Sequence, residues 1–422
     1  MIRFFGSGEM SLRLVPLLAG IASLFMFTAL AKRLLTPAAV PIAVGFFVLS
    51  GPLIYYSSEA KQYSTDVAIA LGLFLIASTA LKGGGRLRVV GMTIAAGLSI
   101  WFSQPAVFVV AGIGLAWLWV AAREHDRSAL IRVAIFGVVA SCSFILSYLT
   151  SLRYLVRDHL LMEYWNGAFV PMPPFSLSAI WWYINRWIEM CENPVGLTFV
   201  GLATLAAAIG IREMFREDRQ SLLMLILPVF FALVASGLHR YPFRGRLLLF
   251  AVPSLLLIIA YGLAAIRSKT RGIVPELSVL LIGLLFFQPL VEAIHNLLKP
   301  RGVEEIRPAL EYIEKHRASG DVLYCYYAAE PALKYYSYRE TIRRMTTITG
   351  ISSRGDWTGY RKDLDQLRGG SRVWFIFSHD YRDDGVDEER LFLDYLDGMG
   401  KRNDGFHAVG ASAYLYDLRT RE

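Results

Sequence analysis

Cysteine is scarce in this sequence. The 422 residues include three cysteines, Cys142, Cys191 and Cys325, and none belongs to a Cys-x-x-Cys pair or a Cys/His zinc-ligand pattern. The sequence therefore indicates no metal site and no redox motif. A disulfide between Cys191 and Cys325 remains open, because sequence alone cannot place two cysteines within bonding distance.

Charged residues are also scarce. They make up 18% of the chain, against about 25% in average soluble proteins, while hydrophobic residues reach 55%. The apolar residues gather in runs, and a run of about 20 residues crosses a bilayer as a helix. The runs that are long enough, or nearly so, occupy residues 12–31, 38–56, 65–81, 88–102, 105–122, 133–150, 195–211, 221–238, 247–265 and 273–290. We therefore predict an all-α polytopic membrane protein with about ten transmembrane helices over residues 1–298.

The remainder, residues 299–422, has the composition of a soluble domain. Strand-like runs occupy residues 321–327, 372–377 and 413–418, and helical patterns occupy residues 302–316 and 387–399. We predict a small mixed sheet with flanking helices. The tail has no glycine-rich phosphate loop and no internal repeat, which favours a docking or support domain over a catalytic one.

The net charge of +8 comes from the membrane half. Basic residues concentrate in alternate connections: Lys32, Arg33, Lys82, Arg86, Arg88, Arg123, Arg127, Arg132, Arg212, Arg216, Arg219, Arg267, Lys269 and Arg271. The positive-inside rule makes these connections cytoplasmic. Residues 59–66, the loop 151–194, residues 239–246, the N-terminus and the tail then face outward. No basic stripe interleaved with aromatics is present, so nucleic acid is not an expected partner.

One outward connection contains acids and a base between apolar runs. A helix beginning near residue 58 would place four side chains on one face, Glu59, Gln62, Tyr63 and Asp66. Lys61 would project from the side of that face and could reach phosphate headgroups. Ionisable groups at a membrane are costly and suggest function, so we predict Glu59 and Asp66 as catalytic residues and Lys61 as a phosphate ligand. Simple interfacial anchoring is the alternative.

A second outward cluster lies at residues 239–246. Arginines bind phosphate oxygens bidentately, so Arg240, Arg244 and Arg246 are candidates for a lipid phosphate, with anchoring to anionic lipids as the alternative. Tyr63, His239 and Tyr241 are possible substrate contacts. The loop 151–194 is rich in tryptophan and tyrosine, as an aromatic belt or a sugar-stacking surface would be. The acids of this loop are also candidate catalytic bases, and the sequence does not indicate which of them acts: Asp158, Glu163, Glu189 and Glu192.

Several motifs together resemble a known family. They are FFG and SLRLVP (residues 4–6 and 11–16), YYSSEAKQY (55–63) and YPFRGRL (241–247). The membrane half resembles the C-type glycosyltransferases, in the branch related to protein O-mannosyltransferases and lipid A aminoarabinose transferases. The tail, with GDV (320–322) and AEPA (329–332), is similar to tails of bacterial members of that branch.

The resemblance implies an enzyme of the bacterial cytoplasmic membrane that takes a sugar from a polyprenyl-phosphate donor. Transfer would be inverting and would occur on the outer face, to an acceptor that the sequence does not identify. Lys61 matches the basic residue that the family places on the donor phosphate, and Asp66 matches an acid of the mannosyltransferases. Arg244 and Arg246 would hold the phosphate from the other side. No cofactor is implied, although a divalent metal stays open.

One departure concerns the N-terminus. The family begins with a transmembrane helix and an outer loop that carries its principal catalytic aspartate, and Met1 aligns after that loop. We therefore expect a helix and loop upstream of Met1, on which activity would depend. A flippase of lipid-linked glycans and a non-catalytic membrane scaffold remain the alternative functions.

Overall fold

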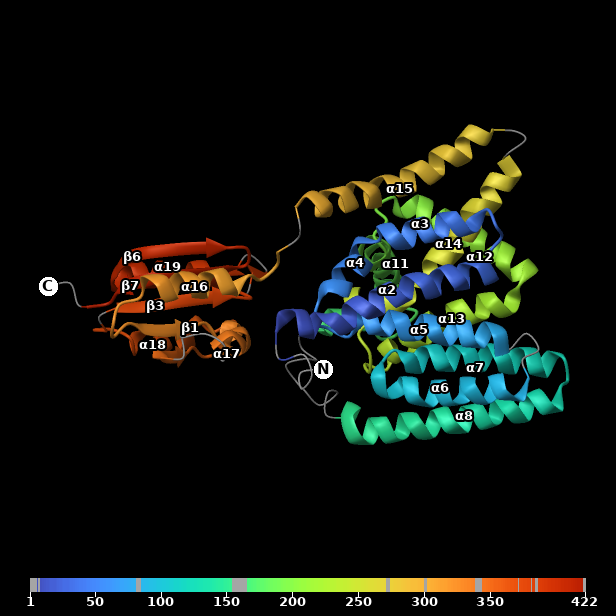
Figure 1. Ribbon diagram of the computed structural model, residues 1–422, viewed down its shortest axis with the longest axis horizontal. Helices are drawn as coiled ribbons and strands as arrows, with labels where there is room; N and C mark the ends of the chain where they lie inside the picture. Colours follow the sequence, from blue (N-terminus) through green and yellow to red (C-terminus); the bar gives the residue numbers. More distant parts are fainter. Residues whose placement is uncertain are drawn as a thin grey trace. The chain divides into compact units, whose positions relative to one another are not determined.

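The computed structural model describes residues 6, 8–80, 85–153, 165–270, 274–299, 302–337, 344–370, 372–380, 382–383 and 386–419 (Figure 1). The chain divides into two compact units, Met1–Leu298 and Lys299–Glu422. Residues 4 and 5 of the first motif lie outside the described residues.

The first unit is built from helices. They are α2 (Glu9–Leu34), α3 (Ala39–Leu49), α4 (Gly51–Ser58), α5 (Tyr63–Ala80), α6 (Arg86–Phe102), α7 (Ala106–Arg123), α8 (Arg127–Ser147), η1 (Tyr148–Leu152), η2 (Asn166–Ala168), α11 (Leu177–Met190), η3 (Cys191–Val195), α12 (Val200–Glu217), α13 (Arg219–Gly237), η4 (Gly245–Ala251), α14 (Val252–Thr270) and α15 (Pro275–Leu298).

The prediction of a polytopic helical membrane protein is confirmed. Among the described residues, seven helices are long and apolar enough to cross a membrane, or nine if each bent pair is one span. The first pair is α3 with α4, bent by 48°; the second joins residues 177–195 to α12 and is bent by 95°. The predicted transmembrane run 88–102 corresponds to α6. With 17 residues, α6 is shorter than each of the seven candidate spans.

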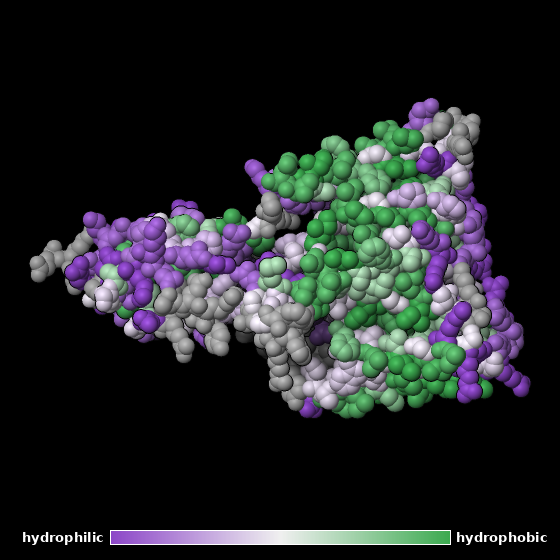
Figure 2. Space-filling model, viewed as in Figure 1, coloured by the Kyte–Doolittle hydropathy of each residue, from purple (hydrophilic) through white to green (hydrophobic). Residues whose placement is uncertain are grey.

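The surface of this unit is apolar where lipid would contact it. Figure 2 shows a broad hydrophobic face, with hydrophilic residues gathered at the end that carries the α7–α8 connection. The exposed side chains of α8 are typical, among them Ile131, Ile135 and Val138. By contrast, 94% of the apolar span that includes α14 is buried, because α3, α12, α13 and α15 contact this helix.

Helices α12 and α14 approach each other through glycines. A Cβ added at Gly262 would lie 1.9 Å from the carbonyl oxygen of Ala206, and one at Gly210 would lie 2.1 Å from that of Ile258. No side chain fits at either position, so the two backbones contact directly. Such small-residue contacts are a common means of packing helices within a membrane, where apolar burial does not drive association.

We expect Gly262→Ala to destabilise the membrane unit by more than the usual cost of overpacking, about 1–3 kcal/mol, because only backbone movement can relieve the clash. Gly201→Ala in α12 is the control, since nothing lies within 4 Å of its Cβ. The midpoint of thermal aggregation in detergent, followed by size-exclusion chromatography, should fall for the first variant and hold for the second. An unchanged midpoint for Gly262→Ala would contradict this contact.

The tail unit contains a five-stranded mixed sheet in the order β2-β1-β3-β7-β6. Its strands are β1 (Val322–Cys325), β2 (Thr346–Thr349), β3 (Arg372–Ser378), β6 (Lys401–Ala408) and β7 (Ala411–Asp417), and β4 (Arg382–Asp383) pairs with β5 (Val386–Asp387). The helices are α16 (Ile306–His316), η5 (Tyr327–Ala329), α17 (Glu330–Ser337), α18 (Trp357–Asp365) and α19 (Glu388–Met399). The predicted mixed sheet with flanking helices is confirmed, and β2 and β6 were not predicted.

Tyrosine hydroxyls on one face of this sheet donate hydrogen bonds to buried carboxyl groups of α18 and α19. Tyr324 donates to Asp363 at 2.6 Å, and Tyr414 donates to Glu389 at 2.8 Å. Glu388, 2% exposed, accepts from the hydroxyl of Tyr326. Buried carboxylates are tolerated here because phenol hydroxyls replace the water they lose.

Asp321 joins the start of β1 to β3. Its carboxylate accepts from Arg372 Nε (2.8 Å), from the indole N–H of Trp374 (3.0 Å) and from the backbone N–H of Ala318 (2.9 Å). Burial alone would raise the pKa of Asp321, but these donors hold that pKa below its usual value.

We expect Asp321→Asn to destabilise the tail by about 3 kcal/mol, since it removes a charge from a buried, hydrogen-bonded pair. Because the folded pKa of Asp321 is lowered, its contribution is complete above about pH 4 and is lost as the pH falls further. Pulse proteolysis of the tail within the intact chain should show that loss for the wild type and a smaller one for Asp321→Asn. Equal pH dependence in both proteins would contradict the assignment.

The cysteines are all free thiols. Cys191 is buried inside the membrane unit and Cys325 is buried inside β1 of the tail, while Cys142 is exposed on α8. Each buried thiol thus lies within the core of its own unit.

Candidate functional site

The connection between α4 and α5 is not helical, so the predicted helix beginning near residue 58 is wrong. Helix α4 ends at Ser58, Glu59 is extended (φ −89°, ψ 139°), and α5 begins at Tyr63. Ser57 and Ser58 donate their hydroxyls to carbonyls of the preceding turn. This local bonding competes with helix propagation. Glu59 therefore does not share a helical face with Tyr63 and Asp66.

Asp66 lies in the first turn of α5, on the same face as Tyr63. Its side chain is buried, with 4% exposure, and Oδ1 has no hydrogen-bond partner among the described residues. Tyr241 approaches both residues: burial, and after it the nearby Asp66 and Tyr63, raise the pKa of Tyr241. The Tyr241 hydroxyl donates to the Leu247 carbonyl at 2.7 Å, which fixes its ring.

Arg246 reaches this group from η4. Its guanidinium lies over the ring of Tyr63 (5.8 Å) and over the ring of Trp165 (5.7 Å). Its Nε is buried and has no hydrogen-bond partner in the part of the chain that the structure describes. A cation held between two aromatic rings with a donor unused is prepared to bind an anion.

Lys61 lies at an open pocket of about 500 Å³. Its other walls include Leu12 and Pro16 of α2, Tyr63 of α5 and Phe102 of α6. Lys61 is exposed, and no ion pair of its ammonium group occurs among the described residues. A smaller cavity of about 140 Å³ also borders α2 and is lined by Gly20, Leu24, Phe47, Leu53, Ser64 and Val67.

The predicted arginine cluster is divided in the structure. Arg244 donates through Nε to Glu189 at 2.6 Å, and Arg186 forms an ion pair with the same carboxylate. Arg240 is exposed. The guanidinium of Arg246 lies over the ring of Tyr63, whereas no hydrogen bond or ion pair between Asp66 and either Arg240 or Arg244 occurs among the described residues.

The remaining predicted residues also separate. His239 is exposed and stacks on Phe169, with ring centroids 5.0 Å apart. Of the loop acids, Glu192 is exposed, and Asp158 and Glu163 lie outside the described residues. Sequence reasoning missed Arg186 as a partner of Glu189; the i, i+3 spacing within α11 was the available signal.

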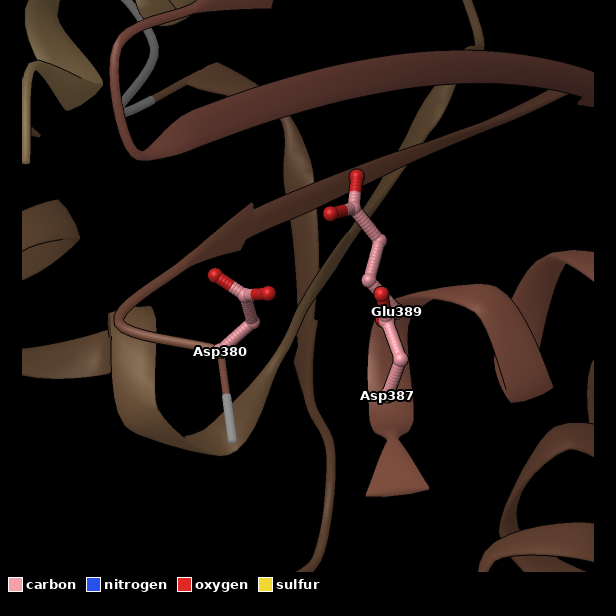
Figure 3. A group of neighbouring side chains, drawn as sticks. All are labelled: Asp380, Asp387 and Glu389. Atoms are coloured by element: carbon pink, nitrogen blue, oxygen red, sulfur yellow. The ribbon is translucent and has the colours of Figure 1, made fainter. Parts of the chain in front are cut away.

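Three carboxylates of the tail also meet, at Asp380, Asp387 and Glu389 (Figure 3). Their nearest oxygens lie within 4.8 Å of one another, and oxygen ligands suit Mg²⁺ or Ca²⁺. Two of the three already have structural roles. Asp387 accepts from the backbone N–H of Arg390 and so caps α19, and Glu389 accepts from Tyr414. The sequence left a divalent metal open, and we assign no ion to these three carboxylates.

No protein-family model and no curated protein matches the chain. Among solved structures, the chain is similar to ArnT from Cupriavidus metallidurans bound to undecaprenyl phosphate, with 12% identity, 98% of this chain and 85% of that chain covered, and a TM-score of 0.45. For the apo state of the same protein, identity and coverage are the same and the TM-score is 0.40.

Proposed function

We propose that this chain transfers a sugar from a polyprenyl-phosphate donor to an acceptor, with Lys61 and Arg246 on the donor phosphate and Asp66 as the base. The observation that carries the proposal is the buried Asp66 carboxyl, which has an unused oxygen and lies one helical turn from Tyr63. The guanidinium of Arg246 lies over the ring of that same tyrosine. A buried acid with an unsatisfied oxygen at the end of a membrane helix is costly, which favours a functional role.

The chemistry of such a transfer matches these residue types. An acceptor oxygen forms a bond to the anomeric carbon, while the bond from that carbon to the phosphate oxygen breaks and its electron pair stays on the phosphate. The acceptor proton passes to Asp66. Lys61 and Arg246 stabilise the charge that develops on the leaving phosphate. A single displacement of this kind inverts the anomeric configuration.

The proposal also places the site on the outer face of a bacterial cytoplasmic membrane. Support comes from the basic residues of the opposite connections, such as Arg123, Arg216 and Arg267, which the positive-inside rule assigns to the cytoplasm. The motif likeness to C-type glycosyltransferases agrees with this arrangement.

Sugar transfer in isolated membranes tests the proposal. Membranes from cells that express the chain from its native locus should transfer radiolabelled sugar from a polyprenyl-phosphate donor to endogenous material, and membranes of the deletion strain should not. Equal labelling in both strains would reject the proposal and leave the two alternatives, a flippase and a non-catalytic scaffold.

A second candidate is translocation of a lipid-linked glycan. The two bent helix pairs favour it, because transporters build their sites from broken spans. A fluorescent lipid-linked glycan in proteoliposomes discriminates the two functions, since a transferase changes the glycan and a flippase only changes the leaflet that holds it.

A further inference from the structure

The last membrane helix carries an acid that the proposed reaction does not use. Glu292 belongs to α15, inside the candidate span Glu276–Leu298, and is half-buried. Its Oε1 accepts a hydrogen bond from Gln288 Nε2 at 2.7 Å, one turn earlier on the same helix. An ionisable group within a membrane helix is costly to insert, so its surroundings indicate what it does.

Helix α15 contacts both halves of the bent pair α3–α4. The ring of Phe286 stacks on that of Phe46 in α3, with centroids 4.2 Å apart. Further along α15, Glu292 meets Gly51, the first residue of α4: a Cβ added to this glycine would lie 3.2 Å from Glu292 Oε2. The carboxylate therefore lies against the N-terminal end of α4, where the pair bends by 48°.

The N-terminus of α4 is not capped by its own N-cap residue. Ser50 occupies that position, yet its side chain makes no capping hydrogen bond, and its buried Oγ has no partner among the described residues. Pro52, in the first turn, has no N–H to donate. The remaining N–H groups and the helix dipole make this end positive, and a nearby carboxylate stabilises it. Glu292 thus supplies from another helix the negative charge that α4 does not carry at its own start.

The other end of α4 leads to the two cations of the proposed site. The helix is about 12 Å long at 1.5 Å per residue. It ends three residues before Lys61. The ring of Tyr56 in α4 packs edge to face against that of Tyr63, with centroids 5.1 Å apart, and Arg246 lies over the same Tyr63 ring. A change in the direction of α4 would therefore displace Lys61, which follows the helix directly.

We propose that Glu292 is a positioning residue: its carboxylate holds the N-terminus of α4, and α4 in turn holds Lys61 where it binds a phosphate. The inference rests on the proposed function, in which that phosphate belongs to the donor. Glu292 takes no part in the chemical step, because it lies at the opposite end of α4 from Lys61.

Two measurements on the full chain in phosphatidylcholine nanodiscs test this role. Spin labels on Ala60→Cys and on the native exposed thiol of Cys142 report the distribution of distances between the α4–α5 connection and α8, since the other two cysteines are buried. Equilibrium binding of radiolabelled decaprenyl phosphate reports on the phosphate site. The variant is Glu292→Gln, which preserves the shape of the side chain and removes its charge. Glu276→Gln is the matched control, an exposed acid in the first turn of the same helix.

We expect Glu292→Gln to broaden the distance distribution and to raise the dissociation constant of decaprenyl phosphate about three- to tenfold, the effect of a charge at a helix terminus. Glu276→Gln should change neither quantity. Gly51→Ala, which displaces the same carboxylate without removing its charge, should also broaden the distribution. In the Lys61→Ala background, Glu292→Gln should cause a much smaller further loss of binding, because most of its effect passes through that lysine.

Two results would overturn the inference. One is an unchanged distance distribution in Glu292→Gln. The other is a loss of binding as large in the Lys61→Ala background as in the wild type, which would show a general effect on the fold. Failure of the proposed function is a separate result: decaprenyl phosphate would not bind the wild type, or Lys61→Ala would bind it normally. The distance measurement would then still decide whether Glu292 holds α4.

Discussion

Asp66→Asn is expected to lower the rate of sugar transfer by about 10²–10⁴-fold, the usual contribution of a positioned general base. Asparagine preserves the volume of the side chain in its buried position but cannot accept the acceptor's proton. Because donor binding depends on other residues, kcat should fall while KM for the donor stays constant. Initial rates with radiolabelled donor, over a range of donor concentrations, measure both quantities.

The matched control is Asp126→Asn. Asp126 caps the N-terminus of α8, and its neighbours there differ from those of Asp66. Asparagine is an equally good N-cap. This variant should transfer sugar at the wild-type rate. If Asp66→Asn also retains that rate, the base is another residue and the site has been placed wrongly.

The second large effect is expected for Arg246→Ala and Lys61→Ala, each of which should raise the dissociation constant of decaprenyl phosphate about 10–100-fold. Charge-assisted hydrogen bonds of this type contribute about 1.5–3 kcal/mol each. Arg246→Lys should recover only part of the affinity, since lysine keeps the charge but not the planar fork between Tyr63 and Trp165.

Combining the two substitutions makes this test sharper. If Lys61 and Arg246 bind one phosphate, the double variant should lose less than the sum of the single losses. Arg88→Ala, an exposed arginine of α6, serves as the control for loss of one positive charge. Strict additivity of the two losses would indicate two separate anions.

The membrane unit could be predicted from the sequence because a bilayer requires long apolar runs, and such runs are visible without any partner helix. The exact course of the chain at polar positions was not predictable in that way. The break at residues 59–62 depends on serine hydroxyls that bond to their own preceding turn, and helical spacing alone continued the helix through it. Glu59 was therefore placed on the wrong face.

The predicted arginine group shows the same limitation. Arg240, Arg244 and Arg246 lie within one short segment, so sequence proximity suggested one phosphate site. The side chains in fact take different neighbours, and the partner of Arg244 is Glu189, in a different helix. Arg186 was missed although its i, i+3 spacing to Glu189 within α11 was visible in the sequence. In the tail, the exposed strand β2 (Thr346–Thr349) lacks the continuous apolar run that revealed β1 and β3.

The almost complete enclosure of α14 has a consequence for biogenesis. Translocons release helices in order, and this one enters the lipid with only α15 still to follow, yet its final place is at the centre. The earlier helices must therefore leave an opening that α14 later occupies. A mutation that blocks this late insertion would give a protein whose helices all cross the membrane in the correct orientation but do not pack together.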